Sequence, residues 1–104
     1  MDIPLTASRL EALGNPTRLR IYHLLVRAGE PGLAVGQIQD KIGIPASTLS
    51  HHCRALVSVG LVQQERVGTS LICRTNYAVM RGLLDDLAAE CCAESMVQGM
   101  GNPT

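Results

Sequence analysis

The sequence contains no phenylalanine and no tryptophan, and Tyr22 and Tyr77 are its only phenolic rings. An enzyme pocket or a base-stacking surface built on aromatic rings is therefore not expected, and the core must be aliphatic. The chain also lacks an apolar run long enough to cross a membrane, and it does not open on a basic segment followed by an apolar one. We therefore expect no membrane partner, no signal peptide and a cytoplasmic location.

Net charge is lacking as well, because nine basic residues balance nine acidic ones. The charges are unevenly distributed, however. Residues 41–74 contain Lys41 and three arginines against Glu65 alone, whereas residues 82–104 contain acidic residues and no basic ones. Binding to nucleic acid depends on the local field rather than on the net charge, and a dimer would present the basic segment twice. The distribution indicates modest affinity for random DNA and dependence on specific contacts.

The four cysteines lack the spacings of common metal and redox sites. There is no Cys-x-x-Cys pair, and no cysteine lies within residues 35–42. A glycine-rich phosphate loop and an acid pair with a nearby base are also missing from the sequence. We therefore expect no enzymatic activity and no required cofactor. In a cytoplasmic protein the thiols should be reduced.

Residues 45–58 carry the most informative pattern. Leu49, Cys53 and Leu56 recur at helical spacing and form a narrow apolar stripe, joined by Val57. The rest of the helix carries hydroxyl, imidazole and guanidinium groups, which can hydrogen-bond base edges and phosphates in a major groove. This pattern predicts a recognition helix, although an ordinary amphipathic helix is the alternative. The predicted DNA-contacting residues are Ser47, Thr48, Ser50, His51 and Arg54.

The segments before this helix complete a helix-turn-helix. Residues 35–42 have helical apolar spacing, and Gly43-Ile44-Pro45 supplies a short turn between two crossed helices. Two further helices are predicted at residues 4–13 and 16–28. The second of these begins at Asn15-Pro16, since asparagine caps a helix and proline suits its first position.

After Gly60 the apolar period changes from that of a helix to that of a strand. Residues 61–66 and 71–77 are β-rich runs on either side of a four-residue turn at 67–70. A hairpin directly after a recognition helix is a wing. Four wing residues are predicted to reach phosphates or a minor groove: Arg66, Thr69, Ser70 and Arg74. The alternative is that they are ordinary solvated side chains of a hairpin.

The last predicted helix spans residues 78–96, followed by a disordered tail at 97–104. Met80, Leu84, Leu87 and Cys91 form a seam typical of a helix that packs on another helix. Taken together, the chain is predicted to be a single domain over residues 1–104, mainly α with a β-hairpin. Its order, α-α-α-α-β-β-α, is that of a winged helix-turn-helix.

Five short segments carry a family likeness: Ala12-Leu13-Gly14-Asn15-Pro16-Thr17-Arg18-Leu19-Arg20-Ile21, Gly43-Ile44-Pro45, Ser47-Thr48-Leu49-Ser50-His51-His52, Gly60-Leu61-Val62 and Arg66-Val67-Gly68. With this spacing the chain resembles, over about residues 9–92, the ArsR/SmtB repressors of bacteria. The resemblance implies a homodimer, formed through the first and last helices, that binds double-stranded operator DNA. It also implies that His52 supports the recognition helix from behind. Cys53 stands where the family usually has leucine, and we expect it to pack.

The resemblance also implies release from DNA by a metal, metalloid or thiol-reactive signal. Cys91 and Cys92 are adjacent, and neighbouring thiolates can bind one soft trivalent atom. Family members with such a pair in the last helix sense arsenite or methylarsenite, often with a further tail cysteine that this chain lacks. Arsenic(III) at Cys91 and Cys92 is therefore the expected inducer. The alternatives are thiol oxidation, no thiol sensing at all, and a winged helix used for protein docking without DNA.

Overall fold

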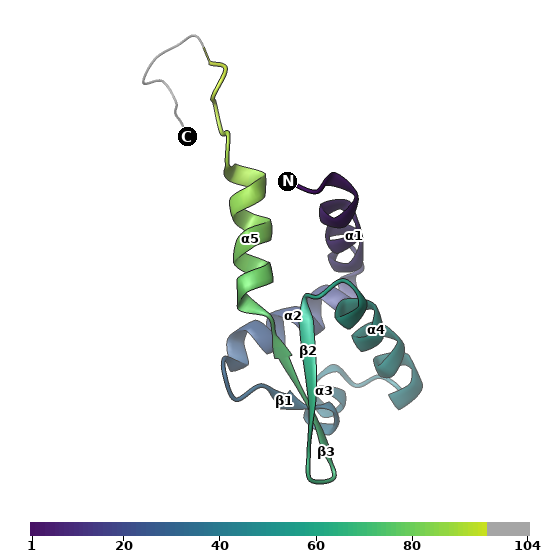
Figure 1. Ribbon diagram of the computed structural model, residues 1–104. Coiled ribbons are helices and arrows are strands. Elements are labelled where there is room, and N and C mark those ends of the chain that lie inside the picture. Colours follow the sequence, from purple (N-terminus) through teal and green to yellow (C-terminus); the bar gives the residue numbers. More distant parts are fainter. Residues whose placement is uncertain (96–104) are drawn as a thin grey trace.

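The structure, a computed structural model, describes residues 1–95 (Figure 1). The predicted order of helices and hairpin is confirmed, and the predicted tail at 97–104 lies outside the described residues. The elements are α1 (Ile3–Leu13), α2 (Pro16–Ala28), β1 (Leu33–Ala34), α3 (Val35–Ile42), α4 (Ala46–Ser58), β2 (Val62–Val67), β3 (Ser70–Thr75) and α5 (Tyr77–Ala88).

Helix α2 is the central element of an aliphatic core. Its start is fixed by Asn15, whose side-chain oxygen accepts hydrogen bonds from the backbone N–H groups of Thr17 and Arg18 at 2.9 and 3.1 Å. Ile21 and Leu25 of α2 are fully buried, in one cluster with buried side chains from α1, α3, α4, α5 and the sheet. The core therefore joins both helices of the helix-turn-helix to the winged sheet.

The sheet has three antiparallel strands in the order β1-β3-β2, so the predicted hairpin gains a strand. Strand β1 pairs Leu33 with Cys73. It was not predicted from the sequence, because two residues are too few to show an alternation of apolar and polar positions. Gly32 makes the pairing possible. Its φ is 68°, and a Cβ atom there would collide with the carbonyl oxygen of Cys73. The hairpin turn is also tighter than predicted, because Val67 pairs with Ser70 and leaves a two-residue loop.

Helix α5 is shorter than predicted, since it ends at Ala88 and not near residue 96. Its last turn has no basic residue, and Asp85 and Asp86 lie near its C-terminal end, where negative charge opposes the helix dipole. Residues 89–95 are also exposed, so no packing in this described segment extends the helix. The predicted seam consequently stops at Leu87, and Cys91 is not part of it.

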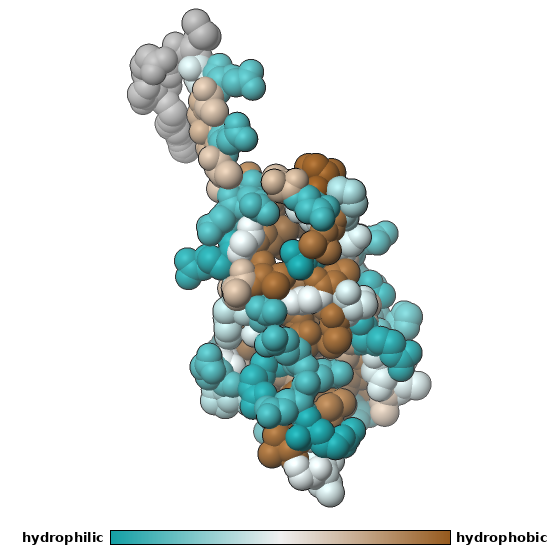
Figure 2. All heavy atoms as spheres, viewed as in Figure 1, coloured by the Kyte–Doolittle hydropathy of each residue, from teal (hydrophilic) through white to brown (hydrophobic). Residues whose placement is uncertain are grey.

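Helices α1 and α5 rise side by side from the body of the domain (Figure 1). Leu84 and Leu87 of α5 are 55% and 54% exposed, and Leu5 and Leu10 of α1 are exposed as well. In Figure 2 hydrophobic residues gather over this part of the surface, whereas hydrophilic residues cover much of the body below it. We call these four leucines the α1/α5 apolar face.

One polar contact ties α1 to the far end of α4. The half-buried Arg9 donates a hydrogen bond from Nε to the carbonyl oxygen of Val59, the C-cap of α4, at 2.8 Å. The carbonyl groups at the end of a helix lack partners within it, so a side-chain donor there satisfies an acceptor. Helix α1 is thereby connected directly to the helix that carries the predicted DNA contacts.

Candidate nucleic-acid interface and thiol groups

The two faces predicted for α4 are present in the structure. Leu49, Cys53 and Leu56 are buried. The residues predicted to contact DNA are all exposed: Ser47, Thr48, Ser50, His51 and Arg54. The polar face therefore points to solvent, while its contact with DNA stays a prediction.

The turn before α4 is held by local hydrogen bonds. Gly43 has φ of 76° and donates its backbone N–H to the carbonyl oxygen of Gln39 at 2.7 Å. The amide of Gln39 in turn donates to the carbonyl oxygen of Ile44 at 3.2 Å. Pro45 is the N-cap of α4 and provides no side-chain acceptor, so the first backbone N–H groups of α4 are left without a side-chain cap. Such groups suit the phosphate oxygens of a nucleic acid.

His52 is half-buried and connects α4 to α2. Arg18 of α2 donates a hydrogen bond from Nε to Nδ1 of His52 at 3.2 Å, so Nδ1 must be unprotonated. The pKa of His52 is lowered from its ordinary value, first by burial and then by the charges of Arg18 and His51. This contact supports the role that the family resemblance implied for His52.

Acidification should therefore weaken the fold through His52. Because the folded-state pKa is below the unfolded value of about 6.5, the unfolded chain binds the proton more readily. The contribution of His52 to stability is present above about pH 6.5 and is lost as the pH falls through the folded pKa. We expect the urea midpoint to fall between about pH 7 and 5, and to fall less in His52→Gln than in the control His51→Gln. Equal pH dependence in both variants would contradict this assignment.

A groove of about 760 Å³ lies between α4, the wing and the start of α3. It brings together Ser50 and Arg54 of α4 with Arg66, Thr69 and Ser70 near the hairpin turn. These five predicted residues thus share one concave surface, whereas Ser47, Thr48 and His51 lie on α4 outside it.

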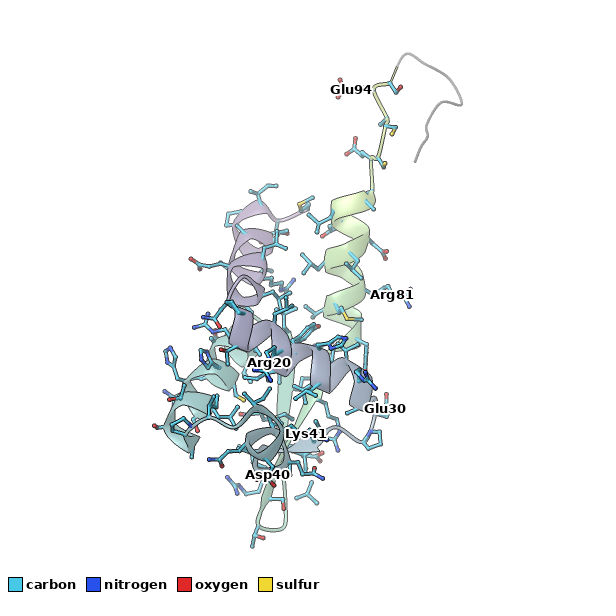
Figure 3. The ribbon with its side chains drawn as sticks, turned by 180° about the vertical axis from the view of Figure 1, so that it is seen from behind. Arg20, Glu30, Asp40, Lys41, Arg81 and Glu94 are labelled. Carbon is cyan, nitrogen blue, oxygen red and sulfur yellow. The ribbon has the colours of Figure 1, made fainter. Side chains whose placement is uncertain are left out.

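The groove also includes α3 residues that the sequence did not single out. Gln37 and Asp40 line it, and the side chain of Gln37 accepts a hydrogen bond from the backbone N–H of Ala34 at 2.9 Å. Figure 3 shows Asp40 and Lys41 projecting from α3. From the sequence alone, Gln37 and Asp40 cannot be distinguished from ordinary solvent-exposed residues of a short helix. Only the folded structure shows that they line the groove beside the wing.

The prediction that Arg74 reaches DNA stays a prediction, and the structure shows that its side chain has partners within the chain. Its Nη1 atom forms an ion pair with Glu65 at 2.6 Å, and its Nε atom donates to the carbonyl oxygen of Glu30 at 2.9 Å. Arg74 lies toward the end of the hairpin away from the turn and does not line the groove. Its guanidinium serves the fold, because it joins the sheet to the loop after α2.

Cys91 and Cys92 lie beyond α5 in a segment of turns, and not in the last helix as predicted. Both are exposed, their Sγ atoms are 3.6 Å apart, and Cys92 has a positive φ of 62°. Figure 3 shows Glu94 on the same segment, clear of the helices. Within residues 1–95, no group of three or more His, Cys, Asp or Glu side chains is placed to hold a metal ion.

The other two cysteines, Cys53 and Cys73, are buried against each other. Cys53 packs as predicted, and a side-chain hydrogen bond with Cys73 raises its pKa, as does burial. The same bond lowers the pKa of Cys73 to about 7, against burial and with the help of a hydrogen bond from Gln64. The sequence analysis did not foresee this pair, because nothing in the spacing of α4 and β3 indicates that the two positions meet.

Among residues 1–95, no helix is long and apolar enough to span a bilayer.

Residues 13–65 match the family of the helix-turn-helix domain. The chain is 38% identical over 63 residues to the uncharacterized HTH-type transcriptional regulator MJ1325 of Methanocaldococcus jannaschii, and the alignment covers 61% of this chain and 68% of that protein. It is 35% identical over 80 residues to the HTH-type transcriptional regulator NmtR of Mycobacterium tuberculosis. That alignment covers 77% of this chain and 64% of NmtR.

Among solved structures, the chain resembles the homodimeric winged helix-turn-helix DNA-binding domain of Mb0332 from Mycobacterium bovis, described as a possible ArsR-family regulator. The TM-score is 0.67 at 33% identity, and the match covers 86% of this chain and 82% of that one.

Proposed function

Because this chain belongs to the ArsR/SmtB family of winged helix-turn-helix transcriptional regulators, we propose that it binds operator DNA as a homodimer and represses transcription until a thiol-binding signal releases it. The family acts by binding DNA and not by catalysis, so the chain is not an enzyme. The groove carries the proposal, since Ser50, Arg54 and Arg66 line one concave surface and such side chains suit the base edges and backbone of a duplex. No cofactor is required for this binding, and the site of action is the cytoplasm.

The dimer is proposed to form through the α1/α5 apolar face. Leucines exposed on two neighbouring helices suit a second copy of the same surface, which would remove them from water. The related domain from Mycobacterium bovis is described as homodimeric. A dimer would also present two recognition helices, as binding to two half-sites in adjacent major grooves requires.

We propose that the signal is an arsenic(III) compound bound by Cys91 and Cys92. A centre that makes bonds of about 2.3 Å to each sulfur spans their 3.6 Å separation at an angle of roughly 100°, which suits a pyramidal trivalent atom. Two sulfurs leave the third position to a substituent that the atom already carries. The pair therefore fits a monosubstituted arsenical such as methylarsenite better than inorganic arsenite.

The energetic demand on such a signal is small. An inducer needs only to favour the dimer arrangement whose recognition helices no longer fit successive major grooves. A coupling free energy of about 1–3 kcal/mol lowers operator affinity about 5- to 150-fold.

A titration of the operator complex tests both parts of the proposal. The protein is bound to DNA from upstream of its own gene, and phenylarsine oxide is added while the bound fraction is followed in a shift assay. We expect release from wild-type protein at about one equivalent per chain, because each exposed pair binds one arsenic. The variant Cys91→Ser/Cys92→Ser should bind the same DNA equally well and should resist release.

The controls separate the alternatives. Release of both proteins at equal arsenical concentration removes the exposed pair from the mechanism. Release by peroxide alone, reversed by a dithiol reductant, favours thiol oxidation. Absence of a sequence-specific complex at low salt contradicts the repressor and leaves the winged helix as a docking module.

A further inference from the structure

A small hollow lies where the end of α2, the sheet and the start of α5 meet. Its volume is about 200 Å³, and it is lined by the turn after α2, by Gln63 of β2 and by residues 74–77, which end β3 and begin α5. Its lining residues and those of the groove between α4 and the wing do not overlap in the described part of the chain. The hollow therefore takes no part in the proposed DNA contacts.

The hollow is rich in hydrogen-bond donors that have no partner. Arg74 uses its Nε and Nη1 atoms within the chain, which leaves Nη2 unpaired among residues 1–95. The side-chain oxygen of Asn76 accepts a hydrogen bond from the backbone N–H of Val79 at 3.2 Å, so its NH₂ group is left. Thr75 is 4% exposed, and its hydroxyl oxygen has no partner in the same residues. Since buried polar groups in proteins nearly always have partners, this hollow suits a group that accepts several hydrogen bonds.

A carboxylate is such a group, because its two oxygens accept hydrogen bonds and bind cationic donors strongly. Glu30 also lines the hollow, but its side chain is exposed and can turn to solvent. The chain has an excess of carboxylates at its other end, where residues 82–95 contain four acidic residues and no basic one. Glu94 is the last of these, and it has no ion pair within residues 1–95.

Glu94 cannot reach the hollow of its own chain. The hollow lies at the start of α5, whereas Glu94 lies beyond its end, clear of the helices (Figure 3). Helix α5 has 12 residues and is therefore about 18 Å long. A carboxylate from this segment can thus enter the hollow only in another copy of the chain.

The dimer of the proposed function, on which this inference rests, brings the two together if its α5 helices are antiparallel. Parallel helices would align their dipoles and place the acidic ends of both copies side by side, which is unfavourable. Antiparallel helices separate these ends. The apolar face then fixes the register, because Leu84 of each copy lies opposite Leu87 of its partner and all four leucines leave the water.

This register leads the acidic segment to the hollow. Ala88 lies opposite Leu83 of the partner, and the start of the partner's α5 at Tyr77 is six residues, or about 9 Å, further on. The seven residues 89–95 can span at most about 23 Å. Glu94 is the sixth of them, so its carboxylate reaches the start of the partner's α5 without a fully extended backbone.

We propose that the hollow at the start of α5 binds the carboxylate of Glu94 from the partner copy, so that the segment after each α5 stabilises the dimer. By symmetry the contact occurs twice in each dimer. Cys91 and Cys92 lie in the same segment, between the end of α5 and the bound carboxylate. The thiol pair of one chain is thereby connected to the winged domain of the other.

The placement is tested with the chain's own exposed thiols. Gln63→Cys adds a thiol at the hollow, whereas the control Gln64→Cys adds one on the opposite face of the same strand. Each variant is treated with a short bismaleimide, and covalent dimers are measured on a denaturing gel. We expect covalent dimers from Gln63→Cys alone, with mass spectrometry showing position 63 linked to Cys91 or Cys92.

Two outcomes of the cross-linking would overturn the proposal. Covalent dimers from neither variant, or equally from both, would show that the segment does not lie at the hollow. Abundant covalent dimers from wild-type protein would show that the thiols of the two copies meet, as they do in parallel helices and not in antiparallel ones.

The role of the charge is tested by sedimentation without DNA. Glu94→Gln should raise the dimer dissociation constant by about 10-fold, because a modest interaction is lost twice in each dimer. Glu90→Gln removes the same charge from the same segment, but it lies beside the partner's α5 and not at its start, so this control should change the constant by less than about twofold. Equal effects of the two substitutions would contradict a specific role for Glu94.

A charge exchange distinguishes the contact from a structural role of either residue. Gln63→Glu places a carboxylate at the hollow and should weaken the dimer, whereas Gln63→Lys should not. Adding Glu94→Lys to Gln63→Glu should restore dimer formation, and failure to restore it would overturn the proposal. Wild-type protein that is monomeric would overturn the proposed dimer itself. A wild-type dimer that forms without the cross-link would overturn only the Glu94 contact.

Discussion

Replacement of Leu84 and Leu87 by aspartate is expected to convert the proposed dimer to a monomer and to lower operator affinity by more than about 100-fold. Full burial of a leucine contributes about 1.5–3 kcal/mol, and these two are already about half buried within the chain. Four such side chains in a dimer therefore contribute about 3–6 kcal/mol, before the cost of burying a carboxylate is added. The oligomeric state is measured by sedimentation, and operator binding by a shift assay.

The volume-conserving variant Leu84→Met/Leu87→Met is the matched control and should stay dimeric. Far-UV circular dichroism shows whether the aspartate variant keeps its helices. We expect the aspartate variant to stay folded, because Leu84 and Leu87 are exposed and lie outside the buried core cluster. A folded aspartate variant that remains a dimer at micromolar concentration would place the interface on another surface.

Replacement of Arg54 by alanine is expected to weaken operator binding by about 5- to 150-fold, equivalent to roughly 1–3 kcal/mol. Arg54 lies in the groove opposite Arg66, and neither side chain has an ion pair in the part of the chain that the structure describes. Arg81→Ala removes the same charge from α5, where Figure 3 shows the side chain directed away from the body. This control should change affinity by no more than about twofold.

The salt dependence tells which part of DNA Arg54 contacts. Loss of a phosphate contact lowers the slope of log affinity against log salt by about 0.9 for each contact, whereas loss of a base contact leaves the slope almost unchanged. If Arg54→Ala and Arg81→Ala weaken binding equally, Arg54 acts only through net charge. In that case the groove is not the surface that recognises the operator sequence.

The recognition helix could be predicted from sequence because one short segment contains both of its determinants. The spacing of Leu49, Cys53 and Leu56 fixes the buried side, and the remaining hydroxyl and imidazole groups are then necessarily outside. The wing was predictable for the same reason, since its two β-rich runs and the turn with Gly68 between them are contiguous in the sequence. Both features depend on residues that are neighbours along the chain.

Features that depend on distant residues could not be predicted. The partners of Arg74 within the chain, the carbonyl oxygen of Glu30 and the carboxylate of Glu65, were not foreseen from the sequence. The short strand β1 forms only because β3 is there to pair with it. The end of α5 follows from a lack of packing, which the apolar spacing up to Cys91 concealed. The contact between Cys53 and Cys73 likewise exists only in the folded chain.

The hydrogen bond from Arg9 to Val59 connects α1 directly to the end of α4. In the proposed dimer, a tilt of α1 would reach the end of α4 through this contact without passing through the wing. The site that binds the proposed signal is thereby separate from the contact that would transmit its effect to α4. Any ligand that moves α1 in the proposed dimer would act on α4 through this contact, so the chemistry of the inducer could change while the DNA-binding surface stays the same.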